Sequence, residues 1–133
     1  MTATAWAHLP NAVHIDRILA SLKAHPDKWE AAWIEAWGTA RNDAWIEAWG
    51  TARNAAWDAA RTAAQTAAWS ASWTAERGAA WSAGGGAITA LIAWDDCAYM
   101  LGLPEDTLKV LHAVGNQQAL LLLGAAKVLR ETS

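Results

Sequence analysis

The residues of this chain whose types favour ligand chemistry are the arginines and tryptophans of one positional series that runs from Trp29 to Trp81. Tryptophan recurs at intervals of four residues, and arginine fills most of the positions where tryptophan is missing. The arginines of the series are Arg41, Arg53, Arg61 and Arg77. A guanidinium group pairs with phosphate through parallel N–H donors, and an indole ring offers a face on which a nucleobase stacks. The series therefore favours binding of a nucleotide-like anion.

We predict that a ligand site combines the four arginines with tryptophans of the same series. The tryptophans assigned to this site are Trp37, Trp49 and Trp73. The alternative is that the arginines stack on neighbouring indoles or pair with acidic residues of the repeat, with no ligand involved. The remaining tryptophans are predicted to pack at an interface between chains. They are Trp33, Trp45, Trp57, Trp69 and Trp81.

The series belongs to a 12-residue repeat that is clearest in residues 32–43 and 44–55. Alanine precedes nearly every Trp or Arg position, and no proline occurs between Asp27 and Gly102, so the repeat is predicted to be helical. A step of four residues exceeds one helical turn by about 40°. The indoles are therefore expected to wind slowly around the helix axis.

Two helical arrangements fit the repeat: one continuous helix over residues 27–83, or several short helices. The candidate breaks are Gly38, Asn42, Gly50 and Asn54. We favour the mostly continuous helix, because the third copy of the repeat lacks both its glycine and its asparagine. Such a helix would be about 85 Å long, at about 1.5 Å per residue. One small chain cannot cover a rod of that length, so we predict a homo-oligomer in which neighbouring chains cover the indoles.

The flanking segments complete an all-α fold, predicted as one helical domain over residues 1–133. Residues 1–26 are expected to hold a short N-terminal helix that starts after Asn11 and ends near Ala24. Gly84–Gly86 is predicted to be a turn. Residues 87–133 are expected to form a C-terminal cap of three helices, over 87–101, 104–114 and 117–130.

Outside the repeat, two acids and a thiol are adjacent at Asp95, Asp96 and Cys97. Neighbouring residues on a helix point about 100° apart, so the two carboxylates cannot readily share a ligand. No CxxC, HxxxH or HExxH spacing occurs. We therefore predict no catalytic residue, no metal and no cofactor. One of the two acids is expected to pair with the repeat, for example with an arginine, and Cys97 to be a small core residue.

The composition narrows the classes of partner. The net charge of −3 provides no overall positive field for nucleic acid or an anionic membrane surface. No apolar run is long enough to cross a membrane. A single cysteine fits a reducing compartment.

The repeats, followed by ITALIAWDDCAYMLGLP and then QQALLLLGAAKVLRE, resemble uncharacterised Trp/Ala-rich repeat proteins of actinobacteria and their phages. The resemblance covers roughly residues 29–130 and assigns no functional residue. It implies a phage origin and the cytoplasm of a bacterial host, where small oligomeric proteins block host defences.

Together these patterns predict a non-enzymatic, oligomeric binding protein. Its predicted role is phage counter-defence, by sequestering a small nucleotide-like signal or a host protein. The alternative is a structural self-assembly or protein-interaction module that has no small-molecule ligand.

Overall fold

A computed structural model describes residues 5–39, 42–72 and 78–132, and in these ranges the chain is helical without strands. The all-α prediction is confirmed. The elements are α1 (Ala12–Ala24), α2 (Pro26–Thr39), α3 (Asn42–Asp58), α4 (Thr62–Ser72), α5 (Gly78–Ala93), the 3-10 helix η1 (Ala98–Gly102), α6 (Glu105–Ala113) and α7 (Gln117–Glu131).

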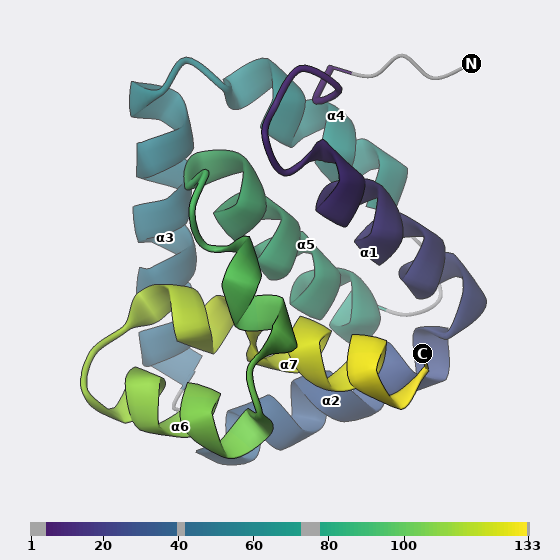
Figure 1. Cartoon of the computed structure of the whole chain (residues 1–133), viewed down its shortest axis with the longest axis vertical. Helices are drawn as coiled ribbons and strands as arrows, with labels where there is room; N and C mark the ends of the chain where they lie inside the picture. The colour runs from purple at the N-terminus through teal and green to yellow at the C-terminus, as the bar shows by residue number, and fades with distance from the viewer. Residues whose placement is uncertain (1–4, 40–41, 73–77, 133) are drawn as a thin grey trace.

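Helix α5 lies in the middle of the molecule, with α3 on one side, α1 and α4 on the other, and α2 and α7 crossing one of its ends (Figure 1). Its sequence consists almost wholly of small and apolar residues. Ile88, Leu91 and Ile92 are each no more than 1% exposed. A helix that is apolar all round has to be covered all round, and five other helices cover this one.

The prediction of a turn at Gly84–Gly86 is wrong, because these glycines lie inside α5. A Cβ atom at Gly86 would lie 2.9 Å from Cζ2 of Trp45, and one at Gly84 would collide with the side chain of Leu22. The glycines therefore let large side chains of α1 and α3 approach the α5 backbone. This packing outweighs the helix-propensity cost of glycine, about 1 kcal/mol each.

The predicted helix over residues 87–101 is also wrong in extent, since α5 ends at Ala93 and η1 follows a turn. The Asn11 side chain explains part of this ending. Its Nδ2 donates to the carbonyl oxygens of Leu91 and Trp94, both at 2.9 Å. These carbonyls lie at the C-terminal end of α5, where no further helical turn satisfies them.

The prediction of one mostly continuous repeat helix is wrong as well. The repeat forms α2, α3, α4 and the first turns of α5, and these helices fold back on one another (Figure 1). Of the predicted breaks, Gly38 and Asn42 lie at the α2–α3 boundary, whereas Gly50 and Asn54 lie within α3. The rod that motivated the oligomer prediction is therefore absent, and the chain covers part of its repeat with its own helices.

The break between α3 and α4 occurs at Ala60, which has a φ of 59°. The N–H of Arg61 donates to the carbonyl of Ala56 at 2.8 Å, and that of Ala60 donates to the carbonyl of Trp57 at 2.9 Å. This pair of bonds is the Schellman motif, which ordinarily places glycine at the left-handed position. Alanine there carries a conformational cost of about 1–2 kcal/mol.

Alanine, more than tryptophan, occupies the buried seam of the repeat. In α3 and α4 the residue before most positions of the series is buried, and these residues are Ala48, Ala52, Ala56, Ala64 and Ala68. Ala44, before Trp45, is half-buried. The series itself rotates by about 40° per step, so successive indoles differ in exposure. Trp45 and Trp49 pack against the core, whereas Trp57, at the end of α3, is 71% exposed.

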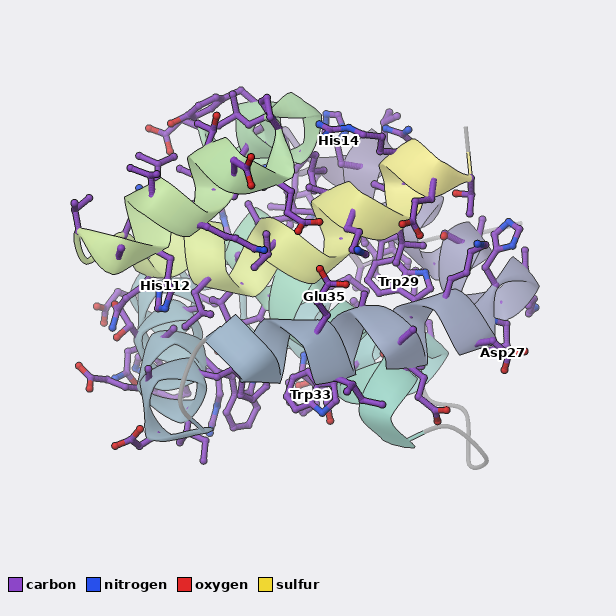
Figure 2. The ribbon with its side chains drawn as sticks, turned by 90° about the horizontal axis from the view of Figure 1, so that it is seen from below. His14, Asp27, Trp29, Trp33, Glu35 and His112 are labelled. Atoms are coloured by element: carbon purple, nitrogen blue, oxygen red, sulfur yellow. The ribbon has the colours of Figure 1, made fainter. Side chains whose placement is uncertain are left out.

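Predictions for the flanking helices agree with the structure. The segments predicted after Asn11, after Pro104 and from Gln117 form α1, α6 and α7. Figure 2 shows Trp29 and Glu35 pointing from α2 toward α7. Trp29 is fully buried and its Nε1 donates to Oγ of Ser21 at 2.9 Å.

A charged cluster joins α2, α6 and α7 at the edge of this contact. The Lys127 ammonium lies 2.6 Å from a Glu35 oxygen, 3.4 Å from Glu105 and 3.8 Å from Glu131. Glu105 also pairs with Lys109 at 3.0 Å. These side chains are partly exposed, so each pair adds little stability and the cluster mainly fixes helix register.

Replacing Ala60 by glycine distinguishes the broken repeat from a continuous helix. We expect Ala60→Gly to raise the free energy of unfolding by about 1 kcal/mol, because glycine adopts a positive φ without steric cost. Ala63→Gly, at an exposed position in α4, is the control and should lower it by about 0.5–1 kcal/mol. Urea denaturation followed by circular dichroism measures both. Equal destabilisation by the two variants would contradict the turn at Ala60.

Candidate functional site

A pocket of about 410 Å³ opens between α3 and α4, and we call it the Trp–Arg pocket. It is lined by Trp49, Arg53, Gln65, Thr66, Trp69 and Ser70. The lining residues form three pairs at a spacing of four along their helices, one pair from α3 and two from α4. Residues at this spacing share one helix face, so each helix turns a contiguous strip toward the pocket.

The turn at Ala60 sets the register of this pocket. Trp49 and Trp69 lie ten residues before and after Ala59, and Arg53 and Gln65 lie six residues before and after it. Because α3 and α4 are consecutive and fold back, residues equidistant from the turn face each other. Positions of the series on α3 therefore face positions of the series on α4, and Trp49 faces Trp69.

Four indoles form a ladder that leads into the pocket. The rings of Trp49 and Trp69 stack with centroids 5.0 Å apart and an interplanar angle of 19°. Trp45 stacks on Trp49 at 6.0 Å and 13°, and Trp33 meets Trp45 edge-on at 4.8 Å and 87°. Offset stacks and edge-to-face pairs of this kind are favourable, by about 0.5–1.5 kcal/mol each.

Arg53 is the charged member of the pocket lining. Its Cζ lies 4.7 Å from the centroid of the Trp49 ring, and its side chain is otherwise exposed. This is the cation–π contact of the alternative interpretation, in which arginines of the series stack on neighbouring indoles. The contact places the guanidinium carbon over the indole, and a guanidinium group has N–H donors along its edge for a further partner.

The two stacked indoles differ at their polar atoms. Trp69 Nε1 donates to Oγ1 of Thr89 at 2.9 Å, and that hydroxyl donates to the carbonyl of Gly85 at 2.7 Å. Trp69 is thereby fixed to α5. Trp49 Nε1, in contrast, is buried and has no hydrogen-bond partner within the described part of the chain. Such an orphan donor costs about 1–3 kcal/mol.

The structure brings together only some of the predicted site residues. Trp49 and Arg53 share the Trp–Arg pocket, and Trp33, Trp45 and Trp69, assigned to an interface, belong to the same ladder. Trp57 lies apart and is exposed. The remaining assignments fall outside what the structure describes. They are Arg41, Arg77 and Trp73, and the side chains of Trp37 and Trp81.

Arg61 is engaged elsewhere, as part of the α3–α4 turn. Its Nη1 and Nη2 donate to the two carboxylate oxygens of Asp95 at 2.6 and 3.3 Å, and Nη1 also donates to the carbonyl of Ile92 at 3.0 Å. The prediction that one of the two acids pairs with a repeat arginine is confirmed for Asp95. The hydrogen bond from Arg61 lowers the pKa of Asp95 and raises that of Arg61.

Sequence reasoning missed the polar part of the lining: Gln65, Thr66 and Ser70. Gln65 occupies a position of the four-residue series, so its place in the pocket follows from the same register as Arg53. Thr66 and Ser70 each come one residue after a position of the series. That signal is visible in the sequence only once the α3–α4 turn is known.

Cys97 is a core residue, as predicted. It is fully buried, and its Sγ lies 3.4 Å from the carbonyl oxygen of Trp94 and 3.5 Å from that of Ala90. Burial, with the nearby Asp96 charge, raises the pKa of the thiol to about 12. A thiol with so high a pKa is protonated at neutral pH and is a poor nucleophile.

No family model, curated protein or solved structure matches this chain. In the described ranges, no group of three or more His, Cys, Asp or Glu side chains gathers where it would hold a metal ion. None of the helices in the described part of the chain has the length and apolar character needed to cross a membrane.

The environment of Cys97 predicts its reactivity. In the folded protein at about pH 8 we expect a disulfide reagent that releases a coloured thiolate to react at least about a hundredfold more slowly than with the chain unfolded in guanidinium, because the thiol is buried and protonated. Absorbance of the released thiolate measures both rates. Rapid labelling of the folded protein would contradict the buried position.

Proposed function

We propose that this chain is a non-enzymatic binding protein that takes a nucleotide-like anion in the Trp–Arg pocket. The observation that carries the proposal is the joint placement of Arg53 over a stacked Trp49–Trp69 pair beside three uncharged polar side chains. An aromatic face, one cation and a few hydrogen-bonding groups are the elements by which proteins hold a planar anion.

Each part of such a ligand has a partner in the lining. The edge of the Arg53 guanidinium pairs with a phosphate oxygen, and this bond is strong because both groups are charged. A base stacks on the exposed part of the Trp69 ring or on the guanidinium plane. Gln65, Thr66 and Ser70 supply donors and acceptors for the edge of the base and for the ribose hydroxyls.

The size of the pocket supports a small molecule. Its volume of about 410 Å³ lies within the usual range for small-molecule sites, about 300–1,000 Å³. The cation and the uncharged polar side chains of the lining support binding of such a molecule. Binding without turnover is what sequestration of a signal requires. The resemblance to phage-encoded repeat proteins supports counter-defence as the setting.

Calorimetry with cyclic nucleotides and ADP-ribose derivatives tests this function. At least one member of the panel should bind the wild type, and Arg53→Gln should weaken that binding by about tenfold or more, because a charge-assisted hydrogen bond is lost. Lys28→Gln is the matched control, since it removes one exposed positive charge from α2 without touching the pocket.

The control should bind as the wild type does. Equal weakening of binding by Arg53→Gln and Lys28→Gln would show that the overall charge of the protein, and not the Trp–Arg pocket, causes the effect. Absence of heat with every compound would reject the nucleotide-like ligand, and circular dichroism of each variant confirms that the fold is retained.

A second function, self-assembly, is favoured by one surface of α3. Ile46 and Trp57 are 52% and 71% exposed. They are eleven residues apart, so they differ by only about 20° around the helix and lie on one line. We propose that this line is where two copies of the chain meet face to face, because a two-fold interface presents the same surface from both copies. Trp57 then serves as the central aromatic anchor.

Sedimentation velocity over a range of concentrations tests the assembly. The wild type should associate, and Trp57→Gln should weaken association by about tenfold or more because the anchor is lost. Val114→Gln is the control, since Val114 is 76% exposed at the end of α6, on another part of the molecule. A monomeric wild type, or equal behaviour of both variants, would reject this interface.

A further inference from the structure

A second hollow of about 420 Å³ lies between α1, η1 and α7, and we call it the α1–α7 groove. Its walls are His14 and Arg17 of α1, Tyr99 and Leu101 of η1, and Leu129 and Arg130 of α7. In Figure 2, His14 lies beside the C-terminal part of α7. The groove shares no residue with the Trp–Arg pocket.

The groove continues along α1. A neighbouring hollow of about 310 Å³ shares Arg17 and Leu129 with it and extends to His25 and Thr132. The Arg17 side chain therefore stands at the junction of the two hollows. A ligand held by Arg17 has apolar floor on Leu129 and room on either side.

The chemistry of the walls is positive in a chain whose net charge is −3. Arg17 and Arg130 both line the groove, and neither hollow has an aspartate or glutamate in its lining. Within the described part of the chain, Arg17 makes no hydrogen bond or ion pair. Its guanidinium is therefore available for a ligand.

Arg130 is positioned before any ligand arrives. Its Nη2 donates to the carbonyl of Leu103 at 2.6 Å and to that of Gly102 at 3.4 Å. These bonds use one of its three nitrogens, and a guanidinium carries five N–H donors in a fixed plane. The remaining donors stay free while the plane is held, so little side-chain entropy is lost when an anion binds.

Tyr99 and two leucines of the groove fit a ligand that carries an aromatic or apolar group beside its anion. Tyr99 is 63% exposed, so its ring is open to contact, and Leu101 and Leu129 form an apolar floor. The Nδ1 atom of His14 is buried and has no hydrogen-bond partner among the described residues, so it lacks a hydrogen bond that buried polar atoms normally make.

We propose that the α1–α7 groove binds a phosphate monoester of an aromatic alcohol. Arg17 and Arg130 hold the phosphate, whose three terminal oxygens accept from both guanidinium groups. The ring of the ligand lies against Tyr99 and over the leucine floor, where its apolar surface leaves water. The site is separate from the Trp–Arg pocket and does not depend on the function proposed for that pocket.

Phenyl phosphate is the probe, and Tyr99 is the reporter because the chain has a single tyrosine. With ¹³C-labelled tyrosine, the ring signals in an NMR titration belong to Tyr99 alone. We expect a saturable shift with phenyl phosphate and at least about tenfold weaker binding in Arg17→Gln, since one charge-assisted contact is lost. Phenol and inorganic phosphate should each bind more weakly than the ester.

One control variant locates the effect. Lys23→Gln removes an exposed charge from the same helix outside the groove. It should retain the wild-type affinity for phenyl phosphate, read at Tyr99. Tyr99 signals that do not move, an affinity unchanged in Arg17→Gln, or equal weakening in Lys23→Gln would overturn the proposal.

Discussion

The close approach of neighbouring side chains to the backbone of α5 is the constraint on which this fold depends. Glycine at 84 and 86 and alanine at 87 and 90 give this helix almost no side-chain thickness on the faces that meet α1, α3 and α7. Trp45 and Leu22 occupy the space thus left, against the helix backbone. Small residues in the centre are therefore matched by large residues around it.

The same constraint places the ladder of tryptophans. Because alanines of α3 and α4 form the buried seam, the indoles that follow them are displaced to the flank of each helix. There they meet one another across the hairpin and not in the centre of the core. The Trp69–Thr89 hydrogen bond then ties the ladder to α5, and Arg61 ties the turn of the hairpin to Asp95. The Trp–Arg pocket is thus supported from two sides.

The two proposed sites share a physical principle although they lie on different helices. In each, a guanidinium group and an aromatic ring line the same hollow: Arg53 lies over Trp49, and Arg17 lines the groove with Tyr99. Both are local positive features on an acidic chain, so long-range attraction contributes little and recognition depends on short contacts. The exposed line of Ile46 and Trp57 differs from both, since it presents two large apolar side chains that suit another protein surface.

Local preferences along the chain account for much of the architecture. Alanine content and the absence of proline predict helix, and the isolated thiol and acids of 95–97 predict core packing and an ion pair. The helix expected after Asn11 is also present, although the Asn11 side chain does not cap it and binds carbonyls of α5 instead. These succeed because they depend on the few residues around each position. The residue types of the series also indicate aromatic stacking and cation–π contacts, and Arg53 makes such a contact with Trp49.

Tertiary packing decided where the repeat breaks and which indoles meet. Ala60 carries no turn signal, yet it takes a left-handed conformation because the hairpin buries two alanine faces at once. Gly84–Gly86 carries a strong turn signal, yet it stays helical because its neighbours need the space. In both places the energy of contacts between distant segments exceeds a local preference of about 1 kcal/mol. Those contacts cannot be predicted from the neighbouring residues alone.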